Sequence, residues 1–269
     1  MIALGIGSCK KNNQTNAETR VQIEINTTKG TILVELYNET PKHRDNFIKL
    51  VNDGFYDSIL WHRVINDFII QTGDQTSIDA KPERKIGAID VGYLVPSEII
   101  DTLFHKRGTL SAAHDGNPDL YSSGSHFVIT QKGPIADSLF KRMEDRINRR
   151  LAVYNTYHAD SNASIYNATL KAYKEQNEEL YKRLSDSVKS MANKLDTPVF
   201  FRFPKEHKEY YMKYGGVPFN DRIYTVFGEV VTGMDVVDSI AATKTDKNDR
   251  PIEDVRIISM RIVNDTNKH

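Results

Sequence analysis

The sequence has little of what marks several large classes of protein. Its single cysteine, Cys9, forms no CxxC pair, and its eight histidines show no HExxH or comparable metal spacing. We therefore expect no metal site, and no motif points to another cofactor. No run approaches the ~20 apolar residues of a membrane-spanning helix. The 36 basic residues are balanced by 36 acidic ones, which argues against a nucleic-acid-binding protein, because such proteins carry a basic excess.

What remains is the composition of an ordinary globular protein. With 269 residues, 39% of them hydrophobic, the chain can bury a full core. This length allows one large domain or one domain with an insertion.

Residues 61–74 form the most informative segment. Arg63, Phe68 and Gln71 stand among β-branched residues, with a polar break at Asn66-Asp67. The segment predicts two short strands around a turn. Arginine and glutamine are costly in an apolar strand unless they line a wet groove or have partners. The pattern therefore indicates a groove at these strands.

Short strands and two helices account for most of the chain. Residues 21–25 and 31–36 alternate apolar and polar side chains and predict a hairpin. Thr40-Pro41 predicts the start of a helix that ends near Asp53, with Gly54 at its C-terminus. Further strands are expected around 61–72, 94–99, 109–113, 126–130, 224–230 and 255–263, and a second helix near 234–241. Many short strands with two helices indicate a closed antiparallel barrel.

Residues 131–213 break this pattern. Apolar residues recur at helical spacing from Leu139 to Leu151 and again from Tyr166 to Leu195. Residues 160–164 between the two stripes are turn-forming. We expect a long antiparallel helical hairpin that projects from the barrel. It would either grip partner polypeptides or contact a neighbouring molecule, or it would pack on the barrel's flank.

Three blocks, in order, resemble the cyclophilin family of peptidyl-prolyl cis–trans isomerases. Residues 61–74 resemble its signature. Residues 105–113 (HKRGTLSAA) and 122–129 (SSGSHFVI) are similar to its "RG-x-L-S-x-A" and "GSQFFI" strands. Residues 224–230 (YTVFGEV) are similar to its "VVFGxV" strand. The resemblance covers roughly 20–130 and 215–263.

The resemblance implies a mainly β fold, a closed eight-stranded antiparallel barrel capped by two helices, here with an inserted α-helical hairpin. We expect a barrel of residues 20–130 and 214–265, a helical insertion of 131–213 and a tether of 1–19. The implied activity is acceleration of X-Pro bond rotation during folding, and the implied partners are proline-containing polypeptides.

The family's functional positions fall on named residues. Arg63 matches the catalytic arginine, Gln71 would orient it or hold the substrate backbone, and Phe68 would form the proline pocket. The resemblance implies further substrate contacts at Ile69, Ala113, His114, His126, Val128, Phe219 and Tyr224. From the residues alone, Arg63 could instead pair with a wall carboxylate. Gln71 could likewise be a satisfied strand amide.

Several positions depart from the family pattern. His126 stands where glutamine is typical, Val128 where a second pocket phenylalanine is typical, Phe219 where tryptophan is common, and Tyr224 where histidine is common. A valine floor widens the pocket and loses ring packing. These departures keep a second hypothesis open, a non-catalytic binding or chaperone module with a vestigial site.

The N-terminus carries a separate signal. Ile6-Gly7-Ser8-Cys9 resembles a bacterial lipobox, in which the cysteine is lipidated, and residues 10–16 form a polar tether. The basic region of a signal peptide is missing, so an incidental cysteine stays an alternative. We expect Cys9 to be the lipid attachment site of a periplasm-facing membrane lipoprotein. This anchor would be the protein's only contact with the membrane. The alternative is a soluble cytoplasmic protein.

Overall fold

The computed structural model describes residues 19–194 and 200–264. Cys9 and the tether expected over 1–19, apart from Thr19, lie outside the described residues. Within the described residues, no helix is long and apolar enough to cross a membrane.

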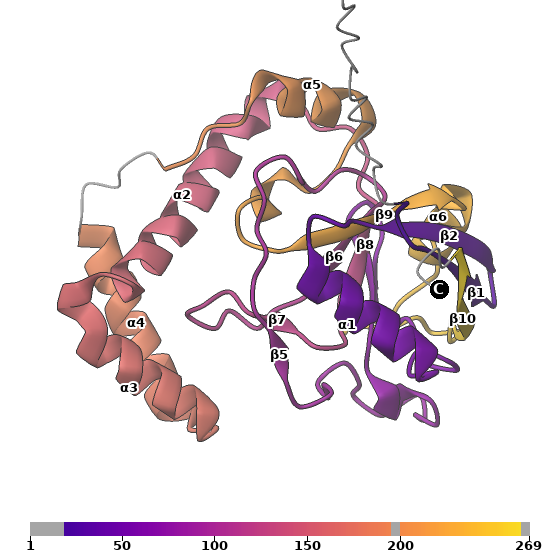
Figure 1. The fold of residues 1–269 in the computed structure, drawn as a ribbon, viewed down its shortest axis with the longest axis horizontal. Coiled ribbons are helices and arrows are strands. Elements are labelled where there is room, and N and C mark those ends of the chain that lie inside the picture. Colours follow the sequence, from indigo (N-terminus) through magenta and orange to yellow (C-terminus); the bar gives the residue numbers. More distant parts are fainter. Residues whose placement is uncertain (1–18, 195–199, 265–269) are drawn as a thin grey trace, which may run out of the picture.

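An eight-stranded antiparallel sheet, curled into a half-barrel, forms the body of the molecule (Figure 1). Its strand order is β10-β1-β2-β9-β6-β8-β4-β3. The strands are β1 (Gln22–Thr27), β2 (Gly30–Leu36), β3 (Arg63–Ile65), β4 (Ile69–Thr72), β6 (Thr109–Ala112), β8 (Phe127–Thr130), β9 (Val226–Thr232) and β10 (Ile257–Asn264). The two edges approach each other, because Ser58 N donates to Ile257 O (2.8 Å) and Trp61 N donates to Val255 O (2.9 Å). The expected eight antiparallel strands are confirmed.

One predicted strand is placed differently. Of the strand expected over 94–99, the structure forms β5 (Leu94–Val95), which pairs with β7 (Ser122–Ser123) in a separate two-stranded ribbon. Pro96 ends it, because proline has no N–H to give to a ladder. The term "mainly β" fits the barrel alone, since the helices hold more residues than the strands.

Two helices lie against the sheet as predicted, α1 (Pro41–Asn52) and α6 (Met234–Ala241). Gly54 follows α1 in the left-handed region, with φ of 66°, a conformation that glycine adopts readily. Thr40 is the N-cap residue and Pro41 begins the helix, as predicted, but the fully buried Thr40 side chain makes no capping hydrogen bond. The Glu98 carboxylate accepts from the N–H groups of Lys42 and His43 instead, each at 3.0 Å.

The insertion is more elaborate than one helical hairpin. It contains α2 (Phe140–Tyr157), α3 (Ala163–Lys174), α4 (Glu178–Lys194) and α5 (Lys205–Tyr214). The second stripe, expected as one helix, breaks between α3 and α4, where Gln176 has φ of 54° and Asn177 N bonds back to Ala172 O (2.9 Å). In Figure 1, α2, α3 and α4 extend away from the sheet, as expected, while α5 turns back towards it.

The base of the insertion shares a core with the barrel's loops. The shared cluster of buried side chains is Ile135, Phe140, Ile147, Leu151, Phe203, Tyr211 and Ile223. At its edge the buried Asp221 carboxylate accepts from Tyr211 Oη (2.9 Å to each oxygen) and from His105 N (2.9 Å). The hypothesis that the insertion only packs on the barrel's flank therefore does not fit α2 and α5. The apolar faces of these two helices form a core together with residues 217–224.

The outer part of the insertion, α3 and α4, packs on α2 and is joined to the barrel by polar contacts to the loop between β6 and β7. Tyr166 Oη donates to Asp119 Oδ1 and Tyr173 Oη to Asp115 Oδ2, each at 2.7 Å. Burial and the nearby Asp115 carboxylate raise the pKa of Tyr173, so it is a donor at neutral pH. Such tethers are worth about 1 kcal/mol each.

This division predicts which part can be removed. After α2 the chain must return roughly 14 Å towards Asn148, a distance that about six Gly/Ser residues span. Replacing residues 159–199 with such a linker should leave a cooperative thermal transition with a slightly lower Tm. Deleting 136–210 should abolish that transition, because it exposes Ile223 and removes α2 and most of α5, the helix that holds Tyr211 against the buried Asp221. Circular dichroism melting compares the two, and a cooperative melt of the larger deletion would contradict the shared core.

Candidate active site

One face of β3, β4 and β8 covers the main core, and the opposite face lines the groove. Side chains alternate along a strand, and Val64, Ile70 and Ile129 point into the main core. The register sets Arg63 opposite Gln71 and Gln71 opposite Val128. Paired residues share a face of the sheet. Arg63, Gln71 and Val128 therefore lie together on the outer face, where the sequence pattern predicts a groove at Arg63 and Gln71.

Arg63 is held from two sides. Its Nη1 donates to Gln71 Oε1 at 3.2 Å, and its Nε lies 3.5 Å from Asp249 Oδ2. The Arg63 side chain stays 40% exposed. Val64 N also donates to Asp249 O (2.7 Å), which fixes the Asp249 loop to β3. The sequence left open a wall carboxylate or a catalytic role, and the structure gives Arg63 a carboxylate neighbour while leaving it open to solvent.

A hollow of about 480 Å³ lies beside this arginine. It is lined by His62, Arg63 and Gln71 and by two loops, residues 82–87 and 246–250. The buried Arg250 joins these loops, because its guanidinium donates to the carbonyls of Lys81 (2.9 Å) and Arg84 (3.1 Å). Its salt bridge to Asp254, at 2.9 Å, holds the guanidinium in place.

An apolar cluster adjoins the arginine on the same face. Ile69, Val128 and Val217 are buried, with Phe68 and Phe219 packed against them. The Phe68 and Phe219 rings stack with centroids 5.8 Å apart. Simple alternation would direct Phe68 away from Ile69. Asp67, with φ of 53°, makes a turn just before β4 that brings the two residues to one side.

Three more predicted residues continue the wall. Ala113 follows β6, and its N donates to His126 O (3.0 Å). The His114 ring stacks on Tyr224 with centroids 4.2 Å apart. Burial and the nearby Arg150 lower the pKa of His114 to about 4, so it is neutral at physiological pH. His114 and Tyr224 form an aromatic surface next to the pocket residues.

His126 is buried, like Ile69 and Val128. It is 8% exposed, its Nε2 lies 3.0 Å from Ile89 O, and its ring faces that of His62 with centroids 5.2 Å apart. The structure therefore places its ring beneath the segment around Ile89, and its substrate contact stays a prediction.

The comparisons with known proteins agree with this geometry. The family model described as "Cyclophilin type peptidyl-prolyl cis-trans isomerase/CLD" matches residues 20–154 and 138–262, on either side of and into the insertion. The chain belongs to the cyclophilin-type peptidyl-prolyl cis–trans isomerase family. This match confirms the family that the three sequence blocks indicated.

Relatives of this cyclophilin match nearly its whole length. A Staphylococcus saprophyticus protein named "Putative peptidyl-prolyl cis-trans isomerase" is 25% identical over 254 residues, covering 93% of this chain and 97% of the relative. A Staphylococcus aureus (strain USA300) protein of the same name is 26% identical over 251 residues, covering 93% and 95%.

Solved structures confirm the fold. A Cryptosporidium parvum cyclophilin-type peptidyl-prolyl cis–trans isomerase has a TM-score of 0.54 at 19% identity and covers 92% of this chain and 99% of its own. The same protein, crystallised in the presence of the dipeptide Ala-Pro, gives 0.52 at 19% identity, covering 91% and 99%.

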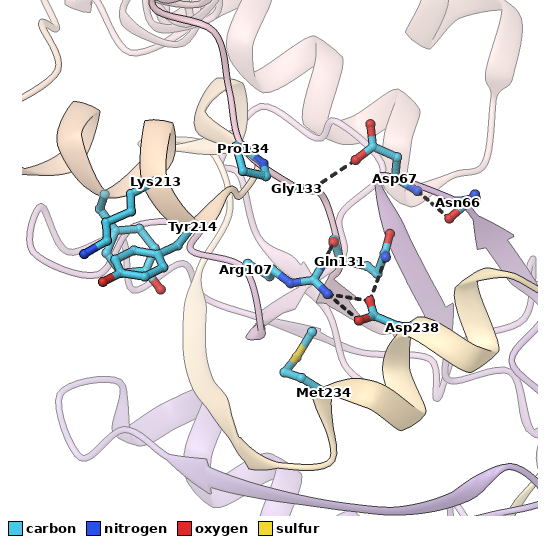
Figure 2. A pocket seen from close by; sticks show the side chains of 11 residues that line it. Asn66, Asp67, Arg107, Gln131, Gly133, Pro134, Lys213, Tyr214, Met234 and Asp238 are labelled. Carbon is cyan, nitrogen blue, oxygen red and sulfur yellow. Dashed lines mark hydrogen bonds and ion pairs between the residues drawn. The ribbon is translucent and has the colours of Figure 1, made fainter.

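A larger hollow of this cyclophilin, about 650 Å³, lies between α5 and α6. Figure 2 shows the Arg107 and Asp238 side chains directed at each other, with Lys213 apart from them. The Asp238 carboxylate accepts from Arg107 Nη2 (2.6 Å) and from Gln131 Nε2 (2.7 Å). Arg107 and Asp238 neutralise each other and Arg63 does not line this hollow, so we place the candidate site in the groove. In the described part of the chain, no three His, Cys, Asp or Glu side chains are grouped to hold a metal ion.

The buried His62 beside the site predicts acid sensitivity. Burial, and next the neighbouring His126, lower the pKa of His62 to about 3, against about 6.5 in an unfolded chain. Between these values the unfolded state binds the extra proton, so stability falls as pH falls. One pKa unit corresponds to 1.36 kcal/mol. His62 alone should therefore cost about 2 kcal/mol between pH 7.5 and pH 5.

Urea unfolding at the two pH values measures this cost. A His62→Gln variant should show a smaller pH dependence. His114→Gln provides a comparison, because its lowered pKa acts in the same window. The lowered pKa values of Asp74 and Glu98 affect stability below about pH 4, outside the range from pH 7.5 to pH 5. An unchanged slope in His62→Gln would contradict the assignment.

Sequence reasoning missed three residues of the site. Asp249 lies in a turn-forming stretch, residues 246–249, which signals a turn and nothing about Arg63. Arg250 stands in a charged stretch that resembles a solvated loop, and it acts by crossing to a loop about 170 positions earlier. Val217, fully buried, follows the insertion, and no periodic pattern points to it.

Proposed function

We propose that this cyclophilin accelerates rotation about X-Pro bonds in proline-containing polypeptides, with Arg63 as the catalytic residue. The observation that carries the proposal is the Arg63 guanidinium, braced by Gln71 and Asp249 and exposed beside the apolar cluster. The proline ring would occupy the cluster, and its nitrogen would face Arg63. The Cryptosporidium parvum relative crystallised in the presence of Ala-Pro supports this substrate class.

The chemistry needs no covalent step. Resonance gives the X-Pro bond a rotation barrier of ~18–20 kcal/mol. As the bond twists, the proline nitrogen regains a lone pair that the planar ground state lacks. A guanidinium donor beside it binds the twisted state more strongly than the planar one and lowers the barrier. Arginine suits this role because it stays charged and presents a rigid fork of donors.

A second candidate is a binding module without turnover. Val128 favours it, because the pocket floor carries no aromatic ring and the fully buried Val217 packs there instead. The same clients would bind in the cluster, while Arg63 would serve as a plain contact.

Exchange spectroscopy on a short X-Pro peptide separates the two functions. Uncatalysed isomerisation takes tens to hundreds of seconds, so catalysis appears as cis–trans exchange that increases with protein concentration. We expect such exchange. Peptide binding without faster exchange would overturn the catalytic proposal and support the binding module.

We further propose that Cys9 carries the lipid anchor of a periplasm-facing lipoprotein that assists the folding of exported proteins. Small residues precede Cys9 and a polar stretch follows it, which supports this placement. One acyl chain anchors a protein marginally and stable anchoring takes more, as a triacylated cysteine would provide. Detergent partitioning of protein expressed from its native locus tests the proposal, and a Cys9→Ala variant that stays membrane-bound would contradict it.

A further inference from the structure

Two arginines of the insertion lie on the aromatic wall of the groove. Arg146 Cζ is 4.2 Å from the Phe219 ring centroid, and Arg150 Cζ is 5.1 Å from the Tyr224 centroid. Arg150 Nη1 also donates to Phe219 O at 3.4 Å. The two arginines are four residues apart on α2 and so share one face of that helix. The insertion therefore supplies the outer rim of the site.

These two cations lack a counter-charge. Within residues 19–194 and 200–264, no carboxylate oxygen lies within ion-pair distance of either guanidinium. The acidic residues of α2 are engaged by other cations: Glu144 pairs with Arg202 at 2.9 Å, and Asp145 pairs with Lys141. Burial, and next the charge of Arg150, lower the pKa of Arg146, as expected for cations without a neutralising partner.

The position of each guanidinium over a ring leaves hydrogen-bonding capacity. A guanidinium packed face-on against a ring keeps the N–H groups of its edge free for a carboxylate. Phe219 stacks on Phe68 at 5.8 Å and carries Arg146 at 4.2 Å. At most about 10 Å therefore separates Arg146 Cζ from the centre of the Phe68 ring. An extended peptide covers that distance in about three residues.

We propose that Arg146 and Arg150 select client segments that carry an aspartate or glutamate within about three residues of the proline. This inference rests on the proposed function of the groove as an X-Pro site. The carboxylate would accept charge-assisted hydrogen bonds from one or both guanidinium edges. Because the contact is partly exposed, the preference should amount to about 3- to 10-fold in kcat/KM and should weaken with added salt.

A positional scan tests the proposal. One X-Pro peptide is prepared with a single aspartate at each position from three before to three after the proline, with asparagine and lysine versions of each. Exchange rates and fluorescence-detected binding are measured for every peptide. At one or more positions the wild type should prefer aspartate to asparagine and disfavour lysine. Arg146→Glu should reverse the order, so that lysine is preferred.

A matched control lies on the same helix. Arg149 is exposed and contacts neither Phe219 nor Tyr224, so Arg149→Glu should keep the aspartate preference despite the same charge change. Equal rates and affinities for aspartate, asparagine and lysine peptides, with normal turnover, would overturn the inference and leave the proposed function standing. Absence of turnover would overturn the proposed catalysis, and the binding series would then decide the preference alone.

Discussion

Replacing Arg63 by alanine is expected to lower kcat/KM on an X-Pro peptide by about 10- to 150-fold. Hydrogen bonds to charged groups are worth about 1.5–3 kcal/mol, and each 1.36 kcal/mol is tenfold in rate. Arg63→Lys should recover little of the loss, because an ammonium lacks the planar fork that meets Gln71 and the substrate together. The measurement is the exchange rate of wild type and variants under identical conditions.

Stability provides the internal control for this variant. The Arg63 side chain is 40% exposed and its contact with Asp249 is of the surface type, worth about 0–1 kcal/mol. The Tm should therefore barely move. Arg261→Ala removes an exposed arginine of β10 that pairs with Asp57, and it should leave turnover unchanged. Undiminished turnover in a folded Arg63→Ala protein would refute the catalytic assignment.

Replacing Asp221 by alanine is expected to cost about 3–5 kcal/mol of folding free energy. The carboxylate is buried and accepts hydrogen bonds from Tyr211 Oη and His105 N, and its Oδ1 lies 2.9 Å from His105 Nδ1. Each buried donor left without a partner costs about 1–3 kcal/mol. Urea unfolding of wild type and variant measures the loss.

Asp101 supplies the matched comparison. It forms an ion pair with Arg222, the residue after Asp221, but its side chain is 76% exposed. Asp101→Ala should change stability by less than about 1 kcal/mol. A loss in Asp221→Ala no larger than that in Asp101→Ala would show that the Tyr211 contact does not secure the insertion.

Local patterns predicted most of the barrel and little of what joins its parts. Alternation located β1 and β2, and a proline at the first helical turn located α1, because these signals lie within a few residues. The Glu98 cap of α1 crosses 55 positions, and no spacing rule reveals it. The break at Gln176 was missed because an apolar stripe at three- and four-residue spacing runs through both α3 and α4.

The site shows the same division. Alternation sets Arg63 opposite Gln71 once the turn at Asn66-Asp67 is recognised, whereas their roles came from the family resemblance. The insertion, which the sequence presents as an appendage, contributes Arg146 and Arg150 to the groove. Periodicity assigns such residues to an exposed face of the helix, and it does not show which part of the protein that face contacts.

The central place of β9 in the sheet has a consequence for synthesis. β9 lies between β2 and β6, yet it leaves the ribosome after the helices of the insertion, which run from Phe140 to Tyr214. At about 5–20 residues per second, these roughly 75 residues take about 4–15 s to translate. Throughout that interval β2 and β6 present unpaired edges, which are sites of intermolecular pairing. The nascent chain is therefore most exposed to aggregation just before β9 emerges, and it is then that a chaperone would protect it.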